Sequence, residues 1–367
     1  MKVTCEKKYI QEASSSCEKI SGHNSTLPIL SSVLISTEKN KLKFSSTNLE
    51  LGLEFLIPAK IEKEGKIALP AKLFSGLISS LTGDKSIRLA SVNNNLVLTT
   101  TNTSTTMKGY NVEDFPVLPK VKEKKSFIIS STDMIIGLKS VYYSTALSEM
   151  KPELNSVFVF SSKNMPLTFV ATDSFRLSEK TIQYNFSDSF NFLIPHKSVV
   201  EILRIFENKN EDIRILLDEN NFTLQSNNIT FISRLIEGNF VDYKQIIPND
   251  FSNKVIVDKK QLVEALRSAV MFCGNLNEIR VKIYGNESFL EIQTSNPDLG
   301  EHVVKIPGKI EGEDLSIVFN QRYLIDCFSS LNSEKVLLKF AGEGRPLLIT
   351  CLDDISFRYL VMPMKNV

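Results

Sequence analysis

Few side chains in this sequence have the types and spacing that catalysis needs. The chain has three histidines, His23, His196 and His302, and it lacks the motifs GxSxG, HExxH, GxxxxGK[ST] and GxGxxG. His196 stands at an expected helix start and Asp173 at an expected strand end, and both positions favour a structural role. The segment GLISSLTGDK has two glycines like a phosphate-binding loop, but they lie seven residues apart, not five. We therefore expect no catalytic residue.

The five cysteines give no sign of a metal site or a disulfide framework. They are scattered along the chain, their number is odd, and none forms a CxxC pair. The stretch MKVTCEKKYIQEA lacks the apolar core of a secretory signal, and no stretch has the apolar length of a bilayer span. We predict a cytoplasmic protein with no cofactor, no metal and no membrane partner.

Length and charge set broader limits. A chain of 367 residues exceeds one ordinary core, so two or three domains are expected. Hydrophobic residues make up 42% and charged residues 23%, as in ordinary globular proteins. The formal net charge of +1 creates no overall field that would attract nucleic acid or a membrane. A basic lining could still lie within this balanced total.

One short sequence motif, called here the repeated word, occurs three times along the chain. TNLELGLEF begins at residue 47, TDSFRLSEK at 172 and the looser SNPDLGEHV at 295. The starts are 125 and 123 residues apart (172 − 47 and 295 − 172), about a third of the chain. Each word follows a β-prone run, so it is predicted to lie at a strand end where the chain turns. A constant period indicates a repeated structural unit.

Two helices are expected in each repeat. The second ones begin at Pro70, Pro195 and Asn320, which suit helix starts because Pro needs no N–H partner there and Asn caps free N–H groups. Steps of three and four predict one buried face for each helix. The predicted faces are Ile10, Ala13, Cys17 and Ile20; Ile135, Leu138 and Tyr142; Leu262, Leu266, Ala269 and Cys273; Leu73, Leu77 and Leu81; Val199, Leu203 and Phe206; and Leu324, Cys327, Phe328 and Leu331.

The repeated unit therefore reads strand, helix, strands, helix, strands. Between helices the pattern changes to period two or to short apolar runs that Asn, Gly, Asp or Lys separate, as in hairpins. Pro- and charge-bearing stretches at 116–125 and 246–254 resemble linkers. We predict an α+β chain of three repeats, 1–121, 122–249 and 250–367. A long α+β chain with accidental similarity is the alternative.

Four motifs in order resemble a known family. LPILSSVLI (27–35), ATDSFRLS (171–178), EGNFVDYKQIIP (237–248) and VMPMK (361–365), together with the repeat, resemble the bacterial DNA polymerase III β subunit, the sliding clamp, over the whole chain. The resemblance implies three DNA-clamp domains per chain and a head-to-tail homodimer closed into a ring around double-stranded DNA, with helices inside and sheets outside. It implies a non-catalytic processivity factor that tethers the replicative DNA polymerase, the clamp loader and other proteins with a clamp-binding motif.

The resemblance also implies a peptide-binding groove at the junction of the second and third repeats. Ser174 and Phe175 stand where Gly-His is usual, Val241 where proline is common and Gln245 where arginine is common. A buried last strand is the alternative interpretation of VMPMK. The implied groove residues are Leu154, Thr172, Ser174, Phe175, Arg176, Leu177, Val241, Ile246, Asn320, Tyr323, Pro346, Val361, Met362, Pro363 and Met364.

A ring that slides would meet phosphates through its helices without base readout. A solvated helix face is the alternative for each basic candidate. The DNA-facing candidates are Asn24, where arginine is usual, with Lys72, Lys139, Lys197, Arg204, Lys259 and Lys260.

The resemblance places the subunit joint at two short stretches. Thr105 and Met107 are expected on one side, and Met271 and Phe272 on the other. Thr105 replaces a larger apolar residue, so a weaker ring is expected. Burial of Met271 and Phe272 within their own repeat is the alternative.

Two other functions remain open from the sequence. One is an enzyme with a site at a domain junction, which the lack of a catalytic constellation disfavours. The other is a peptide-binding scaffold that does not encircle DNA. Charge reversal at Lys72, Lys197 and Lys259 should impair only a DNA ring.

Overall fold

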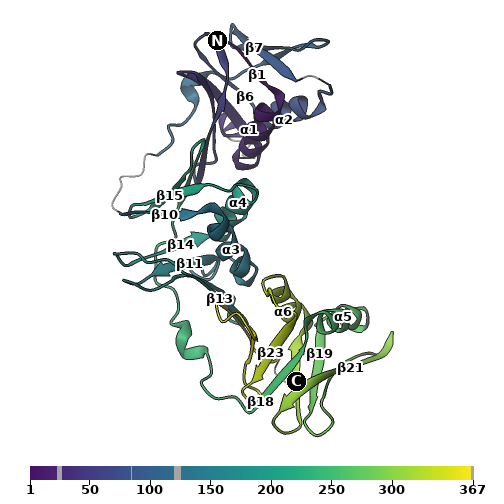
Figure 1. Cartoon of the computed structure of the whole chain (residues 1–367). Coiled ribbons are helices and arrows are strands. Elements are labelled where there is room, and N and C mark those ends of the chain that lie inside the picture. The colour runs from purple at the N-terminus through teal and green to yellow at the C-terminus, as the bar shows by residue number, and fades with distance from the viewer. Residues whose placement is uncertain (23–26, 84, 120–124, 365–367) are drawn as a thin grey trace. The chain divides into compact units, whose positions relative to one another are not determined.

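The computed structural model describes residues 1–22, 27–83, 85–119 and 125–364 (Figure 1). The chain folds into two compact units, Met1–Met134 with Val200–Leu235 and Ile135–Val199 with Ile236–Val367. Within the described residues, helices and antiparallel sheets alternate along the chain, which confirms the predicted α+β class. The α-helices are α1 (Lys7–Ile20), α2 (Ala71–Ser80), α3 (Ser131–Val141), α4 (His196–Phe206), α5 (Lys259–Ala269) and α6 (Gln321–Asp326). The 3₁₀ turns are η1 (Pro28–Ser31), η2 (Val112–Asp114), η3 (Tyr142–Ser144), η4 (Tyr243–Ile246), η5 (Val270–Phe272) and η6 (Cys327–Ser329).

The first unit contains a five-stranded and an eight-stranded sheet, and α1 packs on α2 and on strands of the larger sheet. The five-stranded sheet has the order β5 (Lys60–Lys63), β1 (Lys2–Glu6), β7 (Ser86–Val92), β8 (Asn95–Thr99) and β9 (Ser104–Lys108). The eight-stranded sheet has the order β10 (Lys125–Ser130), β15 (Asp212–Leu217), β16 (Asn221–Gln225), β17 (Ile229–Arg234), β4 (Leu51–Pro58), β3 (Lys41–Thr47), β2 (Ser32–Glu38) and β6 (Lys66–Pro70).

The second unit contains one twelve-stranded sheet, and α5 packs on α6 and on β20 and β21. The order begins with β14 (Phe190–Pro195), β11 (Ser156–Ser161), β12 (Leu167–Thr172), β13 (Arg176–Ile182), β25 (Phe357–Val361) and β24 (Leu347–Cys351). It continues with β23 (Lys335–Phe340), β18 (Asn253–Asp258), β21 (Gly300–Glu311), β20 (Phe289–Asn296), β19 (Glu278–Tyr284) and β22 (Leu315–Asn320).

The strand that follows each of the first two copies of the repeated word joins two repeats edge to edge. β4 pairs with β17, the last strand of the second repeat, and β13 pairs with β25, the last strand of the third. The second repeat therefore contributes strands to both units. Such pairing satisfies backbone groups that an open sheet edge would leave free.

Most predicted helix faces are buried. Ile10, Cys17 and Leu266 are examples, with exposed fractions of 1% or less. Tyr142 and Cys273 lie just beyond the ends of α3 and α5, because those helices finish at Val141 and Ala269.

The predicted buried face of α2 is wrong for Leu73 and Leu77, whereas Leu81, directly after the helix, is buried as predicted. The helix buries Ala71, Phe74 and Ile78, while Leu73 is 59% exposed. Leu77 is only partly buried. Two apolar stripes lie side by side on this helix, and the one that meets the sheet carries the larger phenylalanine.

Substitution of Gly137 by alanine is expected to destabilise the second unit. A Cβ at this position of α3 would lie 2.3 Å from Cε2 of Phe169 on β12, far inside van der Waals contact. We expect a loss of roughly 1–3 kcal/mol, despite the better helix propensity of alanine. Thermal unfolding followed by circular dichroism measures the loss. Thr132→Ala on the exposed face of the same helix is the control, and an unchanged melting temperature for Gly137→Ala would contradict the packing described.

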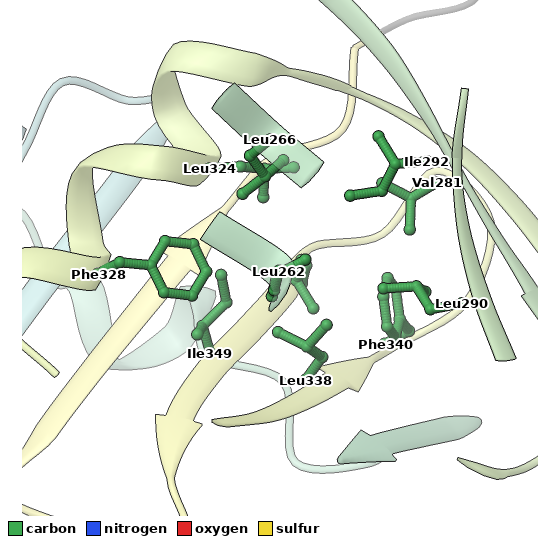
Figure 2. A pocket seen from close by; sticks show the side chains of 11 residues that line it. Leu262, Leu266, Val281, Leu290, Ile292, Leu324, Phe328, Leu338, Phe340 and Ile349 are labelled. Carbon is green, nitrogen blue, oxygen red and sulfur yellow. The ribbon is translucent and has the colours of Figure 1, made fainter. Parts of the chain in front are cut away.

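The core of the third repeat encloses one small apolar cavity of about 20 Å³ (Figure 2). Leu262 and Leu266 of α5 face it together with side chains from the strands beneath. The space could hold about one water molecule, but an apolar lining offers a water no hydrogen bond. This cavity is a packing defect and not a ligand site.

Candidate functional site

The repeated word forms a tight turn between two paired strands. In the second repeat, the Asp173 carboxylate accepts hydrogen bonds from the N–H groups of Phe175 (2.9 Å) and Arg176 (3.0 Å). The Thr172 hydroxyl donates to the Arg176 carbonyl at 2.6 Å. Ser174 has a positive φ of 78°, the left-handed conformation that such turns require. Asp173 therefore caps a turn, as its position at a strand end predicts.

The first copy makes the same turn. Asn48 accepts from the N–H groups of Glu50 (3.0 Å) and Leu51 (2.7 Å), and Leu49 has a φ of 76°. In the looser third copy, Asn296 accepts from Asp298 N–H at 2.9 Å. The word recurs because each repeat needs a side-chain-capped turn at this place.

The carboxyl-terminal tail lies against the second copy of the turn. Strands β13 and β25 place Arg176 opposite Val361. Beyond β25, the Met362 N–H donates to the Phe175 carbonyl at 2.8 Å, and the Met364 N–H donates to the Val318 carbonyl at 2.9 Å. Val361 is fully buried, as a core strand requires, whereas Met362 to Met364 are half-buried beyond the strand. The core-strand interpretation of VMPMK thus holds for its first residue only.

Arg176 joins the turn of the second repeat to a helix of the third. Its Nε donates to Asp173 at 3.0 Å and its Nη1 donates to Asp326 of α6. The guanidinium carbon lies 4.7 Å from the Tyr323 ring centroid, a cation–π geometry. Burial would lower the pKa of Arg176, but the surrounding oxygens outweigh it and raise the pKa, so the charge persists. The arginine was expected here, whereas its carboxylate partners were not.

An aromatic surface lies beside this ion pair. Phe175 is 59% exposed, and its ring stacks near that of Tyr323 with centroids 6.3 Å apart. The Tyr323 carbonyl accepts from the Tyr359 hydroxyl at 2.6 Å, which holds α6 on the last strand. An aromatic pair of exposed Phe175 and half-buried Tyr323, next to half-buried methionines, can receive apolar side chains of a partner, because flexible thioethers adapt to varied shapes.

The linker between the second and third repeats packs on the strands of the joint. Tyr243 is buried with Leu177 and Leu360 in one apolar cluster. Val241 and Ile246 on either side of it are 39% and 44% exposed. These two expected groove residues are therefore half-exposed to solvent next to the joint. Gln245 donates to Asp242 at 2.6 Å within the same turn.

Three other expected groove residues have structural contacts. Leu154 is 5% exposed, and its carbonyl accepts from Ala146 N–H at 2.8 Å. Asn320 caps α6 through the Arg322 N–H at 3.0 Å. Pro346 directly precedes Leu347, which pairs with Val361. The ion pairs of Arg176 in the described part of the chain are formed with Asp173 and Asp326 and not with Asn320.

The DNA-facing candidates differ in their surroundings. Asn24 lies outside the described residues. Lys197 pairs with Glu149 at 2.7 Å and Arg204 with Glu201 at 2.8 Å. The Lys259 ammonium donates to the Leu331 carbonyl, as Lys7 does to Leu81 in the first repeat, so both lysines link the two helices of a repeat. Lys72, Lys139 and Lys260 are exposed.

The four candidates for the dimer interface differ in their exposure to solvent. Met107 is 5% exposed and Thr105 is half-buried on β9. Phe272 stacks on the His302 ring with centroids 5.1 Å apart, which supports burial in its own repeat. Met271, by contrast, is 65% exposed.

The histidines and cysteines of the described residues have structural surroundings. His196 shares a 2.7 Å hydrogen bond with the Thr145 hydroxyl, and burial lowers its pKa. Burial raises the pKa of Cys5 and of Cys17 to about 12, so neither thiol is an activated nucleophile. None of the helices in the described ranges is long and apolar enough to span a membrane.

The fold and the joint define a chain of three similar α+β repeats linked edge to edge, the architecture of DNA clamps. Family models for the DNA polymerase III beta subunit match three times: the N-terminal domain at residues 1–119, the central domain at 129–242 and the C-terminal domain at 244–365. The chain therefore belongs to the DNA polymerase III beta subunit family, the sliding clamps that serve as processivity factors in replication.

Relatives and solved structures agree over the full length. The "Beta sliding clamp" of Streptococcus pneumoniae is 29% identical over 370 residues, 98% of this chain and 97% of the relative. That of Bacillus subtilis is 27% identical and covers 100% of both chains. The solved Bacillus subtilis sliding clamp, at 26% identity, has a TM-score of 0.93, and the beta subunit of Streptococcus pyogenes, at 26%, has 0.94; both cover 100% of each chain.

Proposed function

We propose that two copies of this chain form a head-to-tail ring around double-stranded DNA. The ring slides without reading sequence and, in the cytoplasm, tethers the replicative DNA polymerase, the clamp loader and other proteins with a clamp-binding motif. In this proposal the chain is a non-catalytic subunit with repeats 1–121, 122–249 and 250–367. The observation that carries it is one open strand edge in the first repeat and a matching one in the third.

These two open edges belong to strands that correspond to the paired strands of the internal joints. At each internal joint, the strand after the repeated word pairs with the last strand of the next repeat. In the third repeat that strand is β21, whose residues 300–307 pair with β20 alone among the described strands. In the first repeat the last strand is β9, which pairs with β8 alone. A second copy satisfies both edges, and a head-to-tail contact closes when the rotation suits.

The helices favour the same contact. At the second joint, Tyr143 just after α3 reaches Ser330 just after α6, with 3.2 Å between their hydroxyl oxygens. Met271 occupies the place of Tyr143 in the third repeat, and it is exposed. Ser80 occupies the place of Ser330 in the first repeat. It lies in a surface hollow on α2 whose lining is Ser31, Pro70, Lys72, Leu73, Gly76, Leu77 and Ser80. Met271 of one copy is thus proposed to fill this hollow on the other.

The expected groove residues support partner binding at the second joint. Exposed Phe175 lies beside Tyr323, the half-buried tail follows, and Val241 and Ile246 are half-open. This surface suits a short peptide with bulky apolar residues.

A nicked circular plasmid tests the ring directly. Light scattering should give a mass near twice 41.3 kDa. After loading by a matched clamp loader, the protein should stay on the circle and be lost when the plasmid is linearised. A monomer that never stays on circular DNA would refute the ring and leave a peptide-binding scaffold.

Reversal of three exposed lysines to glutamate should weaken loading onto that plasmid. The variant changes Lys139, Lys197 and Lys260. Lys72 and Lys259 are left out, because Lys72 lines the proposed dimer surface and the Lys259 ammonium donates to the Leu331 carbonyl. Loss of phosphate contacts should reduce loading by about tenfold or more at physiological salt. The control reverses three exposed lysines on strand ends and turns, which are Lys39, Lys63 and Lys163. Equal loading by both variants would contradict a DNA-facing role.

A further inference from the structure

A buried hydrogen bond holds the linker between the second and third repeats. The Tyr243 hydroxyl donates to Oε2 of Glu179 at 2.6 Å, and these residues are 4% and 8% exposed. Burial and the neighbouring carboxylate raise the pKa of Tyr243, so the phenol keeps its proton. Glu179 lies on β13 opposite Arg358 of β25, with 3.7 Å between carboxylate and guanidinium. The bond therefore ties the linker to the strand pair of the joint.

Tyr243 lies between the two wall residues of the proposed groove. Its N–H donates to the Val241 carbonyl at 2.8 Å, and it begins the 3₁₀ turn η4 that Ile246 ends. Its ring meets that of Phe240 edge to face at 6.3 Å. Because Val241 and Ile246 are half-exposed, their positions follow from their neighbours: Tyr243 is buried, and Phe240 and Ile247 are partly buried against the same apolar cluster.

The first linker provides an internal comparison. GYNVEDFPVLP (109–119) and GNFVDYKQIIP (238–248) have equal length and share their first and last residues. Glu54 occupies on β4 the place of Glu179 on β13, since both stand seven residues after the start of the repeated word. Glu54 pairs with Lys43 at 3.3 Å rather than with a linker residue.

The consequence appears in the exposure of the linkers. At the place of Tyr243, the first linker has Asp114, which is exposed. At the place of Ile246 it has Val117, which is 92% exposed, against 44% for Ile246. The difference is confined to this position, because Val112, at the place of Val241, is half-buried, and Leu118 of the first linker lies beside Gly52 of β4. The tyrosine–glutamate bond thus accompanies the lower exposure of Ile246 in particular.

We infer that Tyr243 and Glu179 are positioning residues for the peptide-binding groove. Their hydrogen bond fixes Val241 and Ile246 at the joint, and neither side chain contacts the peptide itself. This inference rests on the proposed peptide-binding function.

The test measures how a labelled synthetic peptide, copied from the clamp-binding motif of the matched replicative polymerase, binds to the full-length protein. Tyr243→Phe should weaken binding by about threefold to tenfold, in the range of one lost hydrogen bond. Ile246→Ala should also weaken it. Adding Tyr243→Phe to the paired substitution Val241→Ala with Ile246→Ala should change the affinity by no more than about twofold, because the tyrosine acts through those two residues. Losses that multiply would overturn the inference.

Matched glutamate variants separate positioning from general stability. Glu179→Ala should reproduce the loss of Tyr243→Phe, whereas Glu54→Ala at the equivalent place of the first joint should leave the peptide affinity unchanged. Glu179→Ala with wild-type affinity would also overturn the inference, even if Tyr243→Phe fails to fold.

Hydrogen exchange without peptide distinguishes the two proposals. Amides of residues 241–247 should exchange faster in Tyr243→Phe than in the wild type, while those of β13 stay protected. If the wild-type protein binds no peptide, the proposed function fails, yet faster exchange would still support the positioning role. Unchanged exchange would refute that role by itself.

Discussion

Deletion of the last five residues, 363–367, is expected to abolish peptide binding and leave the dimer intact. The tail leaves β25 at Val361, and its later backbone bonds run to Phe175 and Val318. The deletion removes the Met364 bond and two of the three described tail residues, but it spares every residue of β25. A loss of at least about 100-fold in affinity corresponds to about 2.7 kcal/mol, which is typical of central contact residues. Fluorescence anisotropy with a labelled motif peptide measures the affinity, and light scattering measures the dimer.

A shorter deletion serves as the control for the tail. Removal of residues 365–367 keeps Pro363 and Met364, which the five-residue deletion removes, so the affinity should stay within about threefold. If the five-residue deletion binds the peptide as the wild type does, the tail is no part of the site and the groove assignment is wrong.

Met271→Glu is expected to convert the dimer into monomers. Met271 is 65% exposed at the place where Tyr143 crosses the second joint, and its proposed contact is the α2 hollow with Leu73 and Leu77. A glutamate there would bury a charge against Leu73 and Leu77, and pairing with Lys72 of the same hollow would offset only part of the desolvation cost, which is several kcal/mol. The mass at micromolar concentration should fall from near twice 41.3 kDa to 41.3 kDa. Dilution of the wild type to nanomolar concentration in the same experiment tests the weaker ring expected from Thr105.

Met165→Glu is the matched control for this substitution. Met165 is 56% exposed on the turn between β11 and β12 of the second repeat, whereas the proposed dimer edges β9 and β21 belong to the first and third repeats, so the dimer should persist. Leu73→Glu on the opposite face should act as Met271→Glu does. A dimer that survives both substitutions would rule out the proposed contact between the third repeat of one copy and the first repeat of the other.

Local chemistry made the elements of each repeat predictable. Pro70, Pro195 and Asn320 each directly precede the second helix of their repeat. They were predictable because few residue types suit a helix start. The repeated word marked the capped turn, because an Asx residue satisfies two backbone N–H groups there. The apolar stripes of α1 and α5 were predictable, because each helix has one such stripe.

The face of α2 was not predictable in the same way. Leu73 and Leu77 form one apolar stripe and Phe74 and Ile78 form the next, so periodicity cannot choose between them. Packing against the sheet buries Phe74 completely and leaves Leu73 in the surface hollow. That choice leaves Leu73, which the sequence pattern had assigned to the core, in the hollow where we propose that a second copy binds.

The joint between repeats shows the same division. The residues alone identify a triplicated α+β chain and its capped turns, because turn capping and helix periodicity act over a few neighbouring residues. They do not reveal that Arg176 meets Asp326, 150 residues away, or that Tyr243 meets Glu179. Those contacts depend on which strands pair across the joint, and strand pairing is set by burial of whole sheet faces and not by any local signal.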